Sequence, residues 1–319
     1  MRTLTETRKW NRSIAAGQTA QIHQHLPQQK RRRPEGLLPG IGGNAMRNNK
    51  TAELVLTSFF AAIIIIMAFT PLGYIPLVVI NATIIHIPVI LGSLFCGPKK
   101  GAFLGFIFGL TSFIKNTIMP SSMSAFVFSP VLAASMIGTS GVFKSAFICF
   151  VPRILVGVVP YFVYIGVKKL LTQEKKNVWA TVLNALIAIF LLVGIRAFVV
   201  KRFEVNATGA TVAAVVIALV VAVVLEVVSL KKNGNVVAFI YSGVLGAMVN
   251  TILVMGSIFV LYKDAYAEAL TIDPNAVLGV IGGVISFNGV IEAIVGAIIV
   301  SAIGLVLNRL KPIEVKKEN

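Results

Sequence analysis

LGSLFCGPKKGAFLGF, residues 91–106, is the stretch that decides the fold, because one apolar segment ends there at a pair of lysines and another begins directly after it. The same arrangement repeats along most of the chain. Apolar segments cover about 52–70, 78–96, 101–118, 145–167, 178–199, 209–229, 236–262 and 277–308. Most reach or approach the ~20 residues that cross a bilayer as a helix. The pattern predicts an all-α polytopic membrane bundle with eight spans.

The basic residues are distributed unequally between the two sides of these spans. From Met46 onward, 14 Lys and Arg fall on the side of the termini and 4 on the other. The positive-inside bias therefore predicts cytoplasmic termini and a multi-pass protein of the cell membrane. Topology also explains much of the formal charge of +17. A basic soluble nucleic-acid binder is disfavoured, because the chain is 56% hydrophobic and only 13% charged.

Residues 1–45 stand outside this pattern, and we expect a membrane domain over 46–319. The first stretch is polar and holds eight Lys or Arg. It cannot bury a core, so it is expected to be a disordered basic tail or a mis-annotated start upstream of Met46.

Neither cysteine nor histidine supplies an obvious reaction centre. Cys96 and Cys149 fall at different depths, beyond disulfide reach, so both are expected to pack as free thiols. The sequence shows no metal-ligand cluster, Walker A motif or Ser-His-Asp set. The chain is therefore expected to be no enzyme and to need no cofactor.

Polar groups inside the spans are the candidate functional residues, since lipid penalises them. Arg153 follows Pro152 in the fourth span and suits capture of a ligand carboxylate. Asn288 and Glu292 lie four apart in the last span, on one helix face. Two interpretations remain open: Arg153 and Glu292 border a ligand, or they form an ion pair that only shapes the cavity.

Each further candidate has two possible interpretations, a ligand contact or a hydrogen bond between helices. The predicted substrate-binding set comprises Asn81, Thr83, His86, Asn116, Arg153, Tyr161, Asn250, Asn288 and Glu292. Arg196 and Glu226 lie near span ends, where long side chains are expected to reach the interface.

Two loops and one helix face complete the prediction. The Pro-rich, aromatic loops 71–76 and 119–130 suit lids over a cavity, with Tyr74, Pro76, Ser124 and Phe126 as gating residues. The first span carries Thr57, Ser58, Ala61 and Ala62, two overlapping pairs of small residues that let another helix approach closely.

The order of these motifs resembles a known family. It runs GYIP (73–76), INATIIHIPVILG (80–92), GPKKG (97–101), FIFGLTS (106–112), VPRILVG (151–157), Asn250-Thr and NGVIE (288–292). This combination is similar to the substrate-binding S components of energy-coupling-factor (ECF) vitamin transporters, and among them to the pantothenate-type members.

The resemblance implies six helices, a vitamin bound near the outer face, and loops that close over it. It also implies three partners, a coupling membrane protein and two ATPases, with Thr57, Ser58, Ala61 and Ala62 docking on the coupling protein. The core would be 52–170 and 236–308, and the helix pair 178–229 is extra. The vitamin stays open, with pantothenate, folate and riboflavin among the choices. The alternative is a stand-alone secondary carrier for a small organic anion.

Overall fold

The computed structural model describes residues 41–76, 81–173, 175–203, 206–231 and 234–313. The prediction for residues 1–45 therefore lies outside the described residues up to position 40. The chain divides into two units, 1–51 and 52–319. The first is described only as the start of helix α2, and the account below concerns the second.

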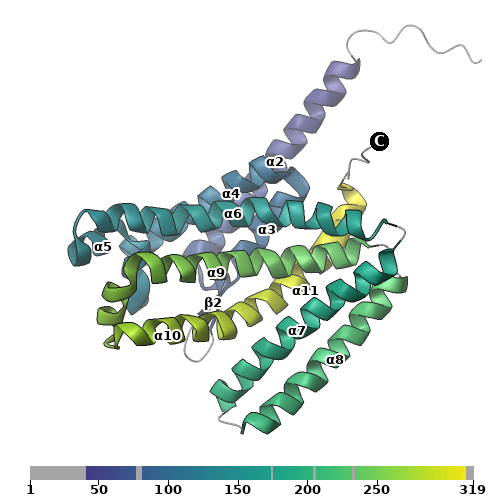
Figure 1. Cartoon of the computed structure of the whole chain (residues 1–319). Coiled ribbons are helices and arrows are strands. Elements are labelled where there is room, and N and C mark those ends of the chain that lie inside the picture. The colour runs from purple at the N-terminus through teal and green to yellow at the C-terminus, as the bar shows by residue number, and fades with distance from the viewer. Residues whose placement is uncertain (1–40, 77–80, 174, 204–205, 232–233, 314–319) are drawn as a thin grey trace, which may run out of the picture. The chain divides into compact units, whose positions relative to one another are not determined.

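Helices make up nearly all of the described structure (Figure 1). The long elements are α2 (Ile41–Phe69), α3 (His86–Cys96), α4 (Pro98–Ile118), α5 (Pro130–Ile137), α6 (Ser140–Leu170), α7 (Lys176–Phe203), α8 (Ala207–Lys231), α9 (Asn235–Leu270), α10 (Val277–Val284) and α11 (Val290–Leu310). The short ones are η1 (Pro71–Gly73), β1 (Tyr74–Pro76), β2 (Asn81–Thr83), η2 (Met123–Phe128), η3 (Pro274–Ala276) and the π-helical η4 (Ile285–Gly289). Seven described helices are long and apolar enough to cross a membrane, and α3 is a shorter apolar one. The predicted polytopic helix bundle is confirmed.

The second predicted span, 78–96, is wrong over 81–85, and its residues 78–80 lie outside the described residues. Helix α3 begins only at His86, and its 11 residues extend about 16 Å against the ~30 Å of a bilayer core. The preceding residues form an antiparallel hairpin in which Tyr74 pairs with Thr83. Pro88 supplies the reason: it lacks an N–H, so it fits the first turn of α3 but would break a helix begun near residue 78.

Glycines bring the backbones of the core helices into contact. A Cβ at Gly157 of α6 would lie 2.0 Å from the carbonyl oxygen of Gly101 in α4. A Cβ at Gly243 of α9 would lie 2.5 Å from that of Gly296 in α11. Figure 1 shows α6 and α9 running side by side, so the contact of α4 with α6 and the contact of α9 with α11 belong to one group of helices. The four helices thus form a tightly packed frame around their buried polar residues.

The extra pair, α7 and α8, forms a hairpin of its own (Figure 1). Glu226 accepts hydrogen bonds from the Thr181 hydroxyl and the Asn184 amide, each at 2.7 Å. Nearer the other end, Arg196 Nε donates to Thr211 Oγ1 at 3.0 Å. The expectation that Arg196 and Glu226 only reach toward the interface is wrong, since both join α7 to α8.

Candidate ligand-binding site

Glu292 ties the hairpin to the helical frame. Its Oε1 accepts the backbone N–H of Thr83 at 2.7 Å, and its Oε2 accepts the hydroxyl of Thr251 at 2.6 Å. The residue is 5% exposed. A carboxylate buried to this degree needs such donors, because desolvation penalises its charge. One side chain therefore holds β2, α9 and α11 together.

Three further buried residues near this junction carry polar atoms without a hydrogen-bond partner. They are both ring nitrogens of His86 and the side-chain oxygens of Asn250 and Asn288. Asn250 directly precedes Thr251, and a Cβ at Gly296, four residues after Glu292, would lie 3.7 Å from His86 Nε2. Buried polar atoms are nearly always paired in folded proteins. Their concentration here is what a site for a polar ligand requires.

A π-helical segment, η4, places Asn288 beside this junction. Neighbouring Gly289 packs against α9, where an added Cβ would lie 3.5 Å from Thr251 Cγ2. Single π-helical turns are rare and recur at functional sites. No sequence pattern indicates this segment, although the four-residue spacing of Asn288 and Glu292 predicted that they share one helix face.

Arg153 has a structural partner and spare donors. Pro152 lacks the N–H that would bond the carbonyl of Ile148, and the Arg153 guanidinium donates to that carbonyl instead. The guanidinium carbon lies 5.5 Å from the ring centroid of Phe108 and 5.0 Å from that of Phe128. Its Nε is buried without a partner, and the residue is 5% exposed. Aromatic faces stabilise the cation and leave donors for an anion.

No ion pair within 4.0 Å joins Arg153 to Glu292, although both side chains are described. The alternative of a direct bridge is therefore not what this structure contains. The cation and the carboxylate keep separate partners inside one buried region.

Other predicted residues are placed elsewhere. The Asn116 amide donates to the Ser112 carbonyl of its own helix at 2.7 Å. Tyr161 lies eight residues after Arg153, about 12 Å along α6, with its ring against Phe162. The side chain of Asn81 lies outside the described residues, although β2 includes its backbone.

The predicted gating residues differ from one another. Tyr74 is half-buried, and the Lys115 ammonium lies 3.8 Å from its ring centroid. Phe126 is 4% exposed and packs edge-on against Tyr262, so it belongs to an inner wall. Ser124 is half-buried, with its hydroxyl 3.2 Å from that of Ser122. The side chain of Pro76 lies outside the described residues.

The small residues of α2 also divide between two faces. Thr57 is 6% exposed and donates its hydroxyl to the Glu53 carbonyl, and Ala61 is half-buried. Ser58 and Ala62 are exposed. A partner helix approaching α2 would meet Ser58 and Ala62, because Thr57 already packs inward.

Sequence reasoning missed Thr251, Phe108 and Phe128. Thr251 directly follows the predicted site residue Asn250. Its polar side chain inside an apolar span could have indicated it as a candidate. Nothing in the sequence distinguishes Phe108 and Phe128 from the other phenylalanines. Within the described ranges, no group of three His, Cys, Asp or Glu is placed to hold a metal ion.

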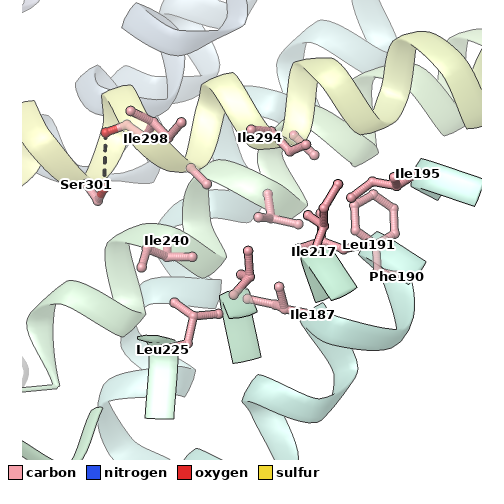
Figure 2. Close-up of a pocket in the computed structure, with 14 residues that line it drawn as sticks. Ile187, Phe190, Leu191, Ile195, Ile217, Leu225, Ile240, Ile294, Ile298 and Ser301 are labelled. Carbon is pink, nitrogen blue, oxygen red and sulfur yellow. Dashed lines mark hydrogen bonds between the residues drawn. The ribbon is translucent and has the colours of Figure 1, made fainter. Parts of the chain in front are cut away.

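A cavity of about 320 Å³ lies between the extra pair and helices α9 and α11 (Figure 2). Its lining is Ile187, Phe190, Leu191, Ile195, Ile217, Val221, Leu225, Ile240, Val244, Ala293, Ile294, Ala297, Ile298 and Ser301. A polar vitamin would lose its hydrogen bonds to water there and find almost no partners. None of the predicted binding residues lines this cavity.

Comparison with known proteins gives matches to vitamin transporters. A family model described as thiamine transporter protein matches residues 54–201. The pantothenic acid transporter of Lactococcus lactis subsp. cremoris is 41% identical over 128 residues, which are 37% of this chain and 61% of that protein. The pantothenate transporter of Leuconostoc mesenteroides subsp. mesenteroides is 27% identical over 267 residues, 82% of this chain and 95% of that protein.

The chain is therefore similar to vitamin transporters, and its long apolar helices indicate a multi-pass membrane protein. The matches confirm the resemblance to S components of ECF transporters, and specifically to the pantothenate-type members. The chain spans about three-fifths of the Lactococcus relative and nearly all of the Leuconostoc one.

Proposed function

We propose that this protein is the vitamin-binding S component of an ECF importer and that its ligand is pantothenate. The observation that carries the proposal is Arg153, a buried cation with an unpartnered Nε. Guanidinium groups bind carboxylates through paired hydrogen bonds. Pantothenate offers one carboxylate, together with hydroxyl and amide groups suited to Asn250, Asn288 and His86.

The same site disfavours thiamine, the vitamin in the name of the matching family model. Thiamine carries a positive charge and would be repelled by Arg153. The acidic group at hand, Glu292, already accepts two hydrogen bonds from the protein. An anionic ligand therefore fits the charges of the site better than a cationic one.

The hairpin β1–β2 is the proposed gate. Glu292 holds β2 at Thr83, and Lys115 holds Tyr74 of β1. Both attachments are made by ionisable side chains of the helical frame. A ligand that competes for these donors and acceptors can shift the hairpin between two positions, which is how loop closure couples to binding.

The energy for vitamin import would come from three partner proteins, a coupling membrane protein and two ATPases. Ser58 and Ala62 on the exposed face of α2 are the proposed contact with the coupling protein. Within the described residues, no set of relay carboxylates follows a path through the bundle, which disfavours a secondary carrier.

Equilibrium binding of labelled vitamins to the purified protein tests the ligand. Pantothenate should bind, and thiamine, folate and riboflavin at the same concentration should neither bind nor compete. Binding of thiamine with no binding of pantothenate would overturn the assignment. Pantothenate accumulation by the chain alone in vesicles, without ATPases, would support the secondary carrier instead.

Cytoplasmic termini are the proposed orientation, and thiol labelling tests it. In a chain without Cys96 and Cys149, a membrane-impermeant reagent added outside should modify Glu268→Cys and spare Lys99→Cys. Both positions are exposed, so accessibility depends on the side of the membrane. The reverse labelling pattern would refute the orientation.

A further inference from the structure

The cavity beside the extra helix pair has the form of a slot between two matched stripes of side chains. On α8, Ile217, Val221 and Leu225 follow one another at four-residue steps. On α11, Ala293, Ala297 and Ser301 do the same. Residues four apart lie on one helix face, so each stripe runs about 12 Å along its axis. The slot therefore runs lengthwise between two membrane-spanning helices.

Two contacts on α7 bracket this slot. The Tyr241 hydroxyl of α9 donates to the Leu183 carbonyl. Eleven residues further on, a Cβ at Gly194 would lie 2.1 Å from Val290 Cγ2, so the helices touch there. Between these two points, α7 contributes Ile187, among other side chains, to the cavity wall. The pair is thus attached at two levels, with the cavity between them.

The chemistry of the cavity lining determines which kind of molecule the cavity can bind. Figure 2 shows aliphatic side chains, the ring of Phe190 and one polar residue, Ser301. Its hydroxyl donates to the Ile298 carbonyl at 3.1 Å, so it is already used. Water needs two to four polar partners and would find none. Apolar cavities of only ~150 Å³ bind small apolar molecules, and this one measures about 320 Å³.

We propose that this slot binds an acyl chain of a membrane phospholipid. Val220 and Val224 on the other side of α8 are 58% and 54% exposed, on a helix apolar enough to span the membrane, so hydrocarbon is the surrounding medium. Acyl chains run along the bilayer normal, as the spanning helices do, and match the direction of the slot. The bound chain supplies the dispersion contacts that the separated helices lack. This site is independent of the vitamin site.

Native mass spectrometry of the full chain, incubated with dioleoylphosphatidylglycerol in detergent, tests the proposal. The wild type should retain one lipid through detergent exchange. Val221→Phe places a ring in the slot and should lower lipid occupancy at least tenfold. Val220→Phe is the matched control, since it adds the same ring one residue away on the exposed face, and it should retain the lipid.

Pantothenate binding, measured on the same preparations, separates the two proposals. We expect Val221→Phe to bind pantothenate as the wild type does. If Val221→Phe does not fold, Leu225→Phe with Val224→Phe as control decides the question, since Leu225 is buried in the cavity lining and Val224 is exposed. Equal lipid retention by a slot variant and its control would overturn the proposal. Displacement of the bound lipid by pantothenate would also overturn it, because the cavity would then be a vitamin site.

Discussion

The six-helix core and the extra pair α7–α8 treat buried polar groups differently. In the core, His86, Arg153 and Asn288 keep polar atoms without partners. In the extra pair, Glu226 and Arg196 are both engaged across the hairpin, and Asn184 Oδ1 is the described atom left over. Paired groups hold helices together, whereas a cluster of unpaired ones is available to a ligand. This difference supports the proposal that the core binds the vitamin and that the pair contributes packing.

The largest expected effect is on vitamin uptake, and it comes from a change on helix α2 of the core. Ala62→Trp should abolish vitamin uptake by cells, because the exposed face of α2 could no longer approach a coupling protein closely. Ligand affinity of the purified chain should stay unchanged. Val193→Trp on α7, also exposed, is the control and should transport normally. Equal uptake by the two variants would remove α2 from the proposed interface.

Arg153→Ala should weaken pantothenate binding by about 1.5–3 kcal/mol, the range for a hydrogen bond to a charged group. This corresponds to roughly a 10- to 150-fold rise in Kd, measurable by isothermal titration calorimetry. Melting temperature must be recorded too, since the variant leaves the Ile148 carbonyl unbonded. Arg153→Lys keeps the charge and should lose less. Unchanged affinity in a folded Arg153→Ala protein would confine Arg153 to a structural role.

Glu292→Ala should loosen the hairpin without unfolding the bundle. It removes the acceptors of the Thr83 N–H and the Thr251 hydroxyl. Loss of about 1.4 kcal/mol would speed amide exchange at Thr83 about tenfold. Glu292→Gln retains an oxygen of similar position and should exchange more slowly than the alanine variant. Identical exchange in the wild type and the alanine variant would show that Glu292 does not hold the gate.

The smallest effect is expected in the extra pair. Glu226→Ala removes hydrogen bonds from Thr181 and Asn184 and should lower stability by about 1 kcal/mol, seen as a modest fall in melting temperature. Pantothenate affinity should stay within about twofold, because no predicted ligand residue contacts this cluster. A large loss of pantothenate affinity would refute the proposed division of roles, since the pair would then take part in ligand recognition.

Hydropathy and charge in the sequence determined the fold class, the long apolar helices and the polar residues that are candidates for the site. Long apolar runs between lysine pairs admit few folds, because lipid forces backbone groups into helices. The two apolar segments within 178–229 were also expected as helices, and the structure contains them as α7 and α8. Arg153, Asn288 and Glu292 were identified for the same reason, since polar groups in apolar spans are rare.

Only the tertiary structure decided which of those residues come together and what each one binds. Asn116 is satisfied within its own helix and Tyr161 lies apart, while Thr251 joins Glu292. Arg153 bonds a carbonyl freed by Pro152, a local relation that the sequence contains but that only coordinates reveal. Hydropathy reports whether a residue lies in the membrane, but not the direction it faces. Direction depends on helix rotation and close approach, which the glycine crossings and the π-helical turn fix.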